Sequence, residues 1–400
     1  MDVTEQLAPR LERYLQQALF LFLILLVATL TFSIAVSSIT FALAIMVGLA
    51  LVFLSKRRLL QPTPLDYFFL AYVCAELLST AFSVEPLSSL VNAKRLFLIA
   101  VVYLTLVSLD TREKYTWAVG IVVGTSVVLS IIEIIPVAEA VDPMRLGMFQ
   151  YPMTTGGMKM IVLLLLLPLV IDKATPVKTR ILSIVGFVPL FIALVLTQTR
   201  SSWLGFIAGG ITIGLAKSKS ILIGIVVLVL IALFLAPHDI QSRVGSIVDP
   251  NHPSNLTRIR MVTTGLRMFL DYPVVGTGDI DLRKLYETYI VPIESAEGGH
   301  LHNNYVMLLV TLGAVGFVVV MTLFVRIFLV EWKTARRTKL DWLYGSIALG
   351  CLAVYVGFLV SGLFEWNFGD HEIAVSLWFT VGLSLVSRKL FETNQNEDAA

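Results

Sequence analysis

Two histidines have the side chains and the position best suited to proton transfer. His300 and His302 stand one residue apart, just before a long apolar run. Histidine is the side chain that exchanges a proton most readily near neutral pH, so either residue could act as a general base. The structural alternative is a histidine that is hydrogen-bonded at the start of a helix capped by Asn303.

The same pair could also bind a metal ion, since histidine is a common zinc ligand. However, no carboxylate or cysteine stands at ligand spacing beside it. Glu294, Glu297 or residues from the last outside loop would have to complete such a site. We therefore expect neither a metal nor any other cofactor.

Arg200 lies in the short connection 197–203 between two apolar runs. The connection is so short that Arg200 must lie at membrane depth or just above it. An arginine there faces protein or a watery cavity, and its planar guanidinium group suits a phosphate. The alternative is an arginine that snorkels to a lipid headgroup.

Three more arginines, Arg258, Arg260 and Arg267, lie in a segment whose apolar residues recur every three to four positions. This spacing predicts an amphipathic helix that ends near 271–273, and its arginines could bind a phosphate or hold the helix to anionic lipid. Further polar residues are expected at the same outer ends: Lys94, Arg95, Arg145, Lys159, Glu365, Asp370 and His371. The surplus of positive charge on that side favours an anionic ligand.

The sequence excludes a nucleotide as the direct substrate. It has no phosphate-binding glycine loop followed by Lys and Ser or Thr, and Gly276-Thr277-Gly278 follows no strand of a βαβ unit. Nothing indicates a nucleic-acid partner. An activated substrate at the outer face would therefore arrive on a lipid carrier.

The elements that position these residues are membrane helices. Of the 400 residues, 57% are apolar and only 14% are charged, and the mean hydropathy is +0.84. The ranges 14–55, 303–325 and 342–364 contain no Asp, Glu, Lys or Arg. A span needs about 20 mostly apolar residues, so the chain is predicted to be an all-α, polytopic membrane protein.

We expect about twelve transmembrane helices and one large outer loop. The helices are predicted at 15–33, 37–54, 65–82, 93–109, 116–135, 157–171, 181–198, 201–216, 220–236, 303–328, 342–364 and 372–387. The positive-inside rule places both termini in the cytoplasm and the loop outside. The predicted divisions are helices one to nine at 1–236, a helical loop subdomain at 237–302, helices ten to twelve at 303–390 and a disordered cytoplasmic tail at 391–400.

Three segments resemble the O-antigen ligases (WaaL type), within the superfamily that also holds O-antigen polymerases and protein O-oligosaccharyltransferases. They are Thr197-Gln198-Thr199-Arg200-Ser201, the Arg258 segment that continues into Asp271-Tyr272-Pro273-Val274-Val275-Gly276-Thr277-Gly278, and His300-Leu301-His302-Asn303 with Gly313 and Gly316. The motifs cover about residues 145 to 316. Gly316 departs from the pattern, because some ligases carry a hydroxyl residue there.

The resemblance implies an inverting, metal-independent glycosyltransferase in the bacterial inner membrane with a periplasmic active site. It would transfer O-antigen from undecaprenyl pyrophosphate to lipid A-core, and a monomer is plausible. His302 would be the base for the acceptor hydroxyl, with Arg200 and Arg258 as its catalytic partners on the pyrophosphate. Further substrate-binding residues would be Arg145, Arg260, Arg267, His300 and Asn303.

Two alternatives remain at this point. An O-antigen polymerase or a protein O-oligosaccharyltransferase would differ only in its acceptor. A non-catalytic transporter of lipid-linked glycan would be expected to carry mid-membrane charges in two matching halves. Few such charges occur here, with Glu76 and Glu133 the nearest candidates.

Overall fold

A computed structural model describes residues 3–54, 62–139, 145–218, 220, 222–224, 226, 227, 231, 234, 238–247, 249–290 and 299–399. Within these residues every regular element is a helix. The predicted all-α, polytopic fold class is therefore confirmed.

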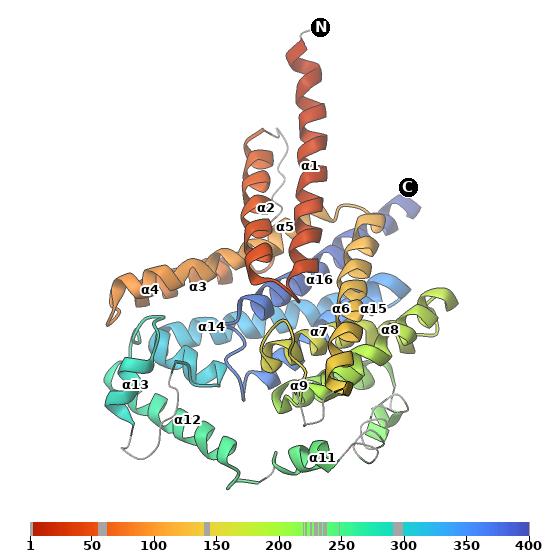
Figure 1. Cartoon of the computed structure of the whole chain (residues 1–400). Helices are drawn as coiled ribbons and strands as arrows, with labels where there is room; N and C mark the ends of the chain where they lie inside the picture. The colour runs from red at the N-terminus through yellow and green to blue at the C-terminus, as the bar shows by residue number, and fades with distance from the viewer. Residues whose placement is uncertain are drawn as a thin grey trace.

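The helices follow one another in an order that Figure 1 traces by colour. They are α1 (Val3–Thr29), α2 (Ile34–Leu54), α3 (Asp66–Ala81), α4 (Pro86–Asn92), the 3-10 helix η1 (Ala93–Ile99), α5 (Ala100–Ser108), α6 (Arg112–Glu139), α7 (Pro152–Ile171), α8 (Val177–Leu196), α9 (Arg200–Lys217), α11 (His238–Gly245), α12 (Pro253–Asp271), α13 (Arg283–Tyr289), α14 (Asn304–Arg337), α15 (Trp342–Ser361) and α16 (His371–Ala399).

Nine helices in the described part of the chain are long and apolar enough to cross a membrane. Three of the twelve predicted spans are not among them. Two of the three, α3 and α9, form helices at the expected places. However, α3 has only 16 residues, and α9 is not among the nine. The third, at 220–236, lies mostly outside the described residues. The chain is thus a multi-pass membrane protein.

The centre of the bundle is formed by α7, α15 and α16, most of whose residues are buried. Small residues let α9 pack closely on α15. A Cβ atom added to Gly205 would lie 2.7 Å from the carbonyl oxygen of Gly357, and one added to Gly209 would lie equally close to that of Ala353. Close packing of small residues is the usual way to join membrane helices. It fixes the start of α9, where Arg200 lies.

A break at Gly313 divides α14, and the segment 273–278 fills it. Gly313 has φ 62° and ψ −172°, a conformation that is practically restricted to glycine. The amide groups of Thr277 and Gly278 donate to the carbonyl groups of Val310 and Thr311 at 2.9 and 3.0 Å. In return, the amide of Ala314 donates to the Pro273 carbonyl at 2.8 Å. The backbone groups freed by the break are therefore paired.

The predicted loop subdomain forms an arc of three helices, α11, α12 and α13, along one side of the bundle (Figure 1). Its apolar side packs on the first part of α14, with Met261, Met268, Tyr286 and Val310 in one buried cluster. The stretch 291–298, which holds Glu294 and Glu297, lies outside the described residues.

The tail differs from the prediction of disorder, because α16 continues to Ala399. Glu392 explains this difference. It accepts from Arg388 one turn earlier at 2.9 Å and from Arg337 of α14 at 2.8 Å. These two ion pairs extend the helix beyond its apolar part.

Candidate active site

The site forms where the starts of α9, α12 and α14 meet the loop between α15 and α16. Asn304, the first residue of α14, holds this loop. Its backbone amide donates to the Gly362 carbonyl at 2.7 Å, and its side-chain amide donates to Asn367 Oδ1 at 2.6 Å. Both asparagines are buried. Residues just before Asn304 are thereby fixed against residues 362–367.

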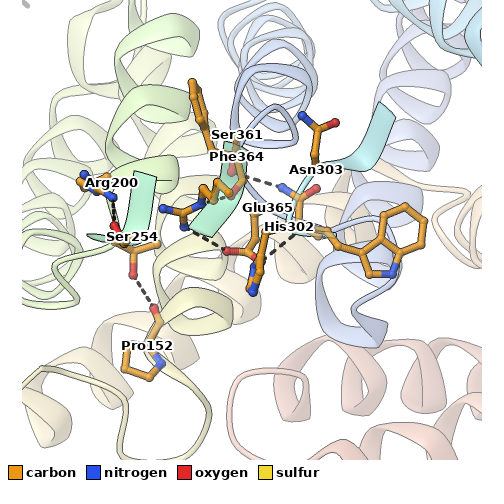
Figure 2. A network of polar contacts seen from close by, with 12 residues as sticks. Pro152, Arg200, Ser254, His302, Asn303, Ser361, Phe364 and Glu365 are labelled. Atoms are coloured by element: carbon orange, nitrogen blue, oxygen red, sulfur yellow. Dashed lines mark hydrogen bonds and ion pairs between the residues drawn. The ribbon is translucent and has the colours of Figure 1, made fainter. Parts of the chain in front are cut away.

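His302 and Glu365 form a hydrogen-bonded pair at this junction (Figure 2). The distance from His302 Nδ1 to Glu365 Oε1 is 2.5 Å. His302 has a left-handed backbone, with φ 44°, two residues before α14 begins. An ionised carboxylate only accepts, so Nδ1 is the donor, and Nε2 is the nitrogen that bears the lone pair when the ring is neutral.

Arg258 of α12 lies on the other side of Glu365. Its Nε donates to the Phe364 carbonyl at 3.1 Å, and its Nη2 lies 3.9 Å from Glu365 Oε2. Burial lowers the pKa of Arg258, although the charge of Glu365 opposes this effect. The arrangement places a guanidinium group and an imidazole on the two oxygens of one carboxylate.

Glu365 is buried but ionised. Burial would raise its pKa, yet the nearby imidazoles of His300 and His302 and the charge of Arg258 outweigh this and lower the pKa to about 2. The sequence placed Glu365 only in a loose group of polar residues at the outer ends. Its role as the partner of His302 required the contact between two loops 63 residues apart.

Arg200 is held by the polar ends of α11 and α12. Its Nη1 donates to the Ser246 carbonyl at 2.6 Å and to Ser246 Oγ at 2.9 Å, and its Nη2 donates to Ser254 and to Asn255 Oδ1. Burial and the charges of Arg258 and Arg243 lower the pKa of Arg200 to about 10, so it stays cationic at neutral pH. Every partner is neutral, which leaves its charge available to an anion.

Two further arginines complete a cationic group near Arg200. Arg145 donates to the Thr197 carbonyl at 3.0 Å and to Thr199 Oγ1 at 3.2 Å. Burial lowers the pKa of Arg145, and the charges of Arg243 and Arg258 lower it further. The second, Arg243, lies on α11 outside the motif segments and carries no signal in the sequence that marks it as functional.

Three other residues that were predicted to bind substrate, Asn303, Arg260 and Arg267, form no hydrogen bond or ion pair with Glu365 in the described part of the chain. Asn303 caps α14, accepting from the amides of Tyr305 and Val306 at 2.9 and 3.0 Å, and donates to the Leu363 carbonyl. Arg260 and Arg267 are exposed on α12. The structure therefore joins His302 and Arg258 through Glu365, with Arg200 and Arg145 nearby, and places Arg260 and Arg267 on the outer surface.

His300, His302 and Glu365 could offer three ligands to a metal ion, since one ligand atom from each lies within 4.8 Å of the others. The last outer loop thus supplies a carboxylate, as a zinc site would require. Two ligands of one tetrahedral zinc ion lie roughly 3.3 Å apart, given bonds of about 2.0–2.1 Å. His302 Nδ1 and Glu365 Oε1 are 2.5 Å apart, which is the spacing of a shared proton.

Comparison with known proteins supports this chemistry. The family described as O-antigen ligase matches residues 185–321, which include Arg200, Arg258 and His302. This match agrees with the resemblance to the O-antigen ligase and polymerase superfamily, and it supports a glycosyltransferase-like role in O-antigen processing. No curated protein matches the chain.

Proposed function

We propose that the protein is an inverting glycosyltransferase that moves O-antigen polysaccharide from undecaprenyl pyrophosphate to lipid A-core. The observation that carries this proposal is the His302–Glu365 pair at 2.5 Å, with the Arg258 guanidinium 3.9 Å from the same carboxylate. A base and a fixed cation at one point match the two demands of the reaction, namely proton removal and charge neutralisation.

His302 Nε2 removes the proton from an acceptor hydroxyl. Glu365 holds Nδ1–H, keeps the lone pair on Nε2 and stabilises the imidazolium that forms. The freed oxygen attacks the anomeric carbon from the face opposite the pyrophosphate, so the configuration inverts. Such a positioned base contributes roughly 10²–10⁴-fold to the rate.

The bond from the anomeric carbon to the pyrophosphate oxygen breaks as the new bond forms, and its electron pair stays on undecaprenyl pyrophosphate. Arg200 and Arg258 neutralise the charge that develops there, with Arg145 as a further contact. Fixed guanidinium groups at a low-dielectric boundary act more strongly than they would in water. They take the place that a divalent ion holds in other glycosyltransferases, so the reaction is metal-independent.

The proposal includes the setting of the reaction. The starts of α9, α14 and α16 face the periplasm, both termini face the cytoplasm and the chain lies in the bacterial inner membrane. The basic loops at the opposite ends of the helices support this orientation.

The test is transfer by the purified protein in liposomes that contain undecaprenyl pyrophosphate-linked O-antigen and lipid A-core. We expect His302→Ala to lose about 10²–10⁴-fold in rate. The comparison variant is His300→Ala, which should lose less than His302→Ala, because His300 Nε2 lies 3.8 Å from Glu365 Oε1 whereas His302 Nδ1 lies at 2.5 Å. Undiminished transfer by folded His302→Ala protein would refute the mechanism. Extension of the donor glycan without use of lipid A-core would identify a polymerase instead.

A further inference from the structure

A cavity of about 350 Å³ lies beside the candidate active site and takes no part in the proposed chemistry. It is formed by the segment 147–152, the start of α2 at Ile34 and the start of α16 at Glu372. Small-molecule sites usually have about 300–1,000 Å³, so this volume suits a small ligand or one unit of a larger one.

The segment 147–152 forms one wall of this cavity and is held in place by specific contacts. Its turn leaves no space for a side chain at Gly147, where a Cβ atom would lie 2.8 Å from the Gln150 carbonyl oxygen. The side-chain amide of Gln150 donates to the Leu30 carbonyl at the end of α1, at 2.6 Å. The wall is thus tied to the α1–α2 hairpin.

The lining suits a neutral ligand rich in hydroxyl groups. It contains no Lys, Arg or His. Its one charged residue, Glu372, is only 5% exposed, and its carboxylate bonds no other side chain among the described residues. A buried carboxylate that is bonded to its own backbone amide can still accept from a ligand hydroxyl, whereas it would repel a phosphate.

Aromatic side chains at the mouth add an apolar surface. Tyr151 is 84% exposed, and Phe149 and Met148 are also exposed. Exposed aromatic rings beside a few polar groups are typical of sites that bind a ligand with both apolar faces and polar edges. A pyranose ring has this character, because its C–H groups form faces and its hydroxyl groups lie at the rim.

The cavity wall continues directly into the active site. Thr154 donates to Asp370 Oδ2 at 3.4 Å, five residues after Glu365, and the Pro152 carbonyl accepts from Thr199 Oγ1 at 2.9 Å. Thr199 in turn accepts from Arg145. Figure 2 shows Pro152 below Ser254, in one view with Glu365. A ligand in the cavity would therefore adjoin the reacting groups.

We propose that this cavity is a saccharide subsite, which binds one sugar unit of a lipid-anchored glycan while the transfer takes place. The inference rests on the proposed function for the identity of the glycan. Both substrates, the donor O-antigen and the lipid A-core acceptor, contain such units, and the experiment below separates them.

The direct test is binding without turnover. Tyr151 is replaced by the photoreactive residue p-benzoylphenylalanine, and the protein is irradiated with three probes in turn: undecaprenyl pyrophosphate-linked glycan, lipid A-core, and undecaprenyl pyrophosphate without glycan. The matched control places the same residue at Tyr67 of α3, which is 86% exposed and lies outside the cavity. We expect glycan-dependent crosslinks from position 151 alone.

Crosslinking to the first probe only assigns the subsite to the donor, and crosslinking to the second only assigns it to the acceptor. Equal crosslinking with and without the glycan would show a groove for the carrier lipid and overturn the proposal. Absence of crosslinks to all three would also overturn it. None of these results requires catalysis, so they stand apart from the outcome for His302→Ala.

Kinetics provide a second test. In the transfer assay we expect Tyr151→Ala and Glu372→Gln to raise KM for one substrate about tenfold, a loss of about 1.4 kcal/mol of binding, with little change in kcat. Tyr67→Ala should change neither quantity. If His302→Ala abolishes transfer while both cavity variants keep wild-type KM values for both substrates, the proposed function stands and the subsite is wrong.

Discussion

The side chains of Asn304 and Asn367 meet at 2.6 Å in the buried centre of the site. Asn304 stands two residues after His302, and Asn367 stands two residues after Glu365. Together with the bond from the Asn304 amide to the Gly362 carbonyl, this bond sets the spacing of the base and its carboxylate. Because both amides are buried, breaking the bond would leave polar groups unpaired at a cost of about 1–3 kcal/mol each.

The carboxylate of Glu365 should be as important as the imidazole it holds. Glu365→Gln keeps the shape but can present an N–H to Nδ1, which favours the tautomer without a lone pair on Nε2. We expect the rate of transfer to lipid A-core to fall by about 10²–10⁴-fold. Glu85→Gln, an exposed acid at the start of α4, serves as the control and should change the rate less than twofold. A Glu365→Gln enzyme with wild-type rate would exclude the pair from the mechanism.

Arg258 and Arg200 should not tolerate lysine. Each guanidinium group makes contacts in a fixed geometry, with Phe364 and Glu365 for Arg258 and with Ser246 and Asn255 for Arg200, which a single ammonium group cannot reproduce. We expect kcat/KM to fall about 10²–10³-fold for Arg258→Lys and for Arg200→Lys.

Arg267→Lys provides the comparison for these variants, because Arg267 is exposed and, among the described residues, donates to the Tyr289 carbonyl at 3.4 Å. Its kcat/KM should stay near that of the wild type. If Arg267→Lys lost as much kcat/KM as the other two variants, the outer face of α12 would belong to the substrate-binding surface.

Asp370 should make stability depend on pH. Burial and the charges of Glu365 and Glu372 raise its pKa from 3.8 to about 7. Because the pKa is higher in the folded state, protonated Asp370 contributes stability below about pH 4, and this is lost as the pH rises through 7. We expect the Tm of the wild type to fall over this interval more than that of Asp370→Asn. Asp110→Asn, which changes an exposed acid, should follow the wild type.

The break in α14 should depend on glycine. A Cβ atom at Gly313 would lie 2.4 Å from the backbone of Val274, in addition to about 1–3 kcal/mol of strain at this φ. Gly313→Ala should therefore lower the Tm in detergent and the yield of folded protein. Gly120→Ala offers a matched control, since nothing lies within 4 Å of the added atom. An unchanged Tm for Gly313→Ala would mean that the segment 273–278 does not need the break.

Transfer should continue in the presence of a chelator. His302 Nδ1 and Glu365 Oε1 are closer than two ligands of one zinc ion would be, and Arg258 already lies beside the carboxylate. We expect the initial rate with EDTA to stay within about twofold of the rate without it. Loss of activity that returns on addition of a divalent ion would instead assign His300, His302 and Glu365 to a metal site.

Much of the fold was predictable because long apolar runs and basic loops are properties of single segments. The positions of Arg200 and His302 at the starts of α9 and α14 followed from the same runs, since helices begin where apolar runs begin. Arg258 could be placed on a helix by periodicity, although its direction toward Glu365 could not.

The remaining features depend on contacts between distant segments. Glu365 and Arg243 carry no local signal that separates them from other polar residues at helix ends. The glycines of α9 pack it against α15, a contact that its own sequence did not indicate. The tail beyond 390 reads as polar and disordered, but Arg337 of another helix pairs with Glu392. Pairing across the fold, rather than composition, determines these outcomes.

The irregular segment 273–278 is inserted at the break in α14 and is held by backbone hydrogen bonds on both sides of it. Backbone bonds do not depend on side-chain identity, so sequence drift in this segment is constrained mainly by Gly276 and Gly278, whose φ values are positive. The arc of α11–α13 therefore cannot be exchanged as an independent module. A chimera that receives the α11–α13 arc of a relative would also need the matching half of α14 from that relative.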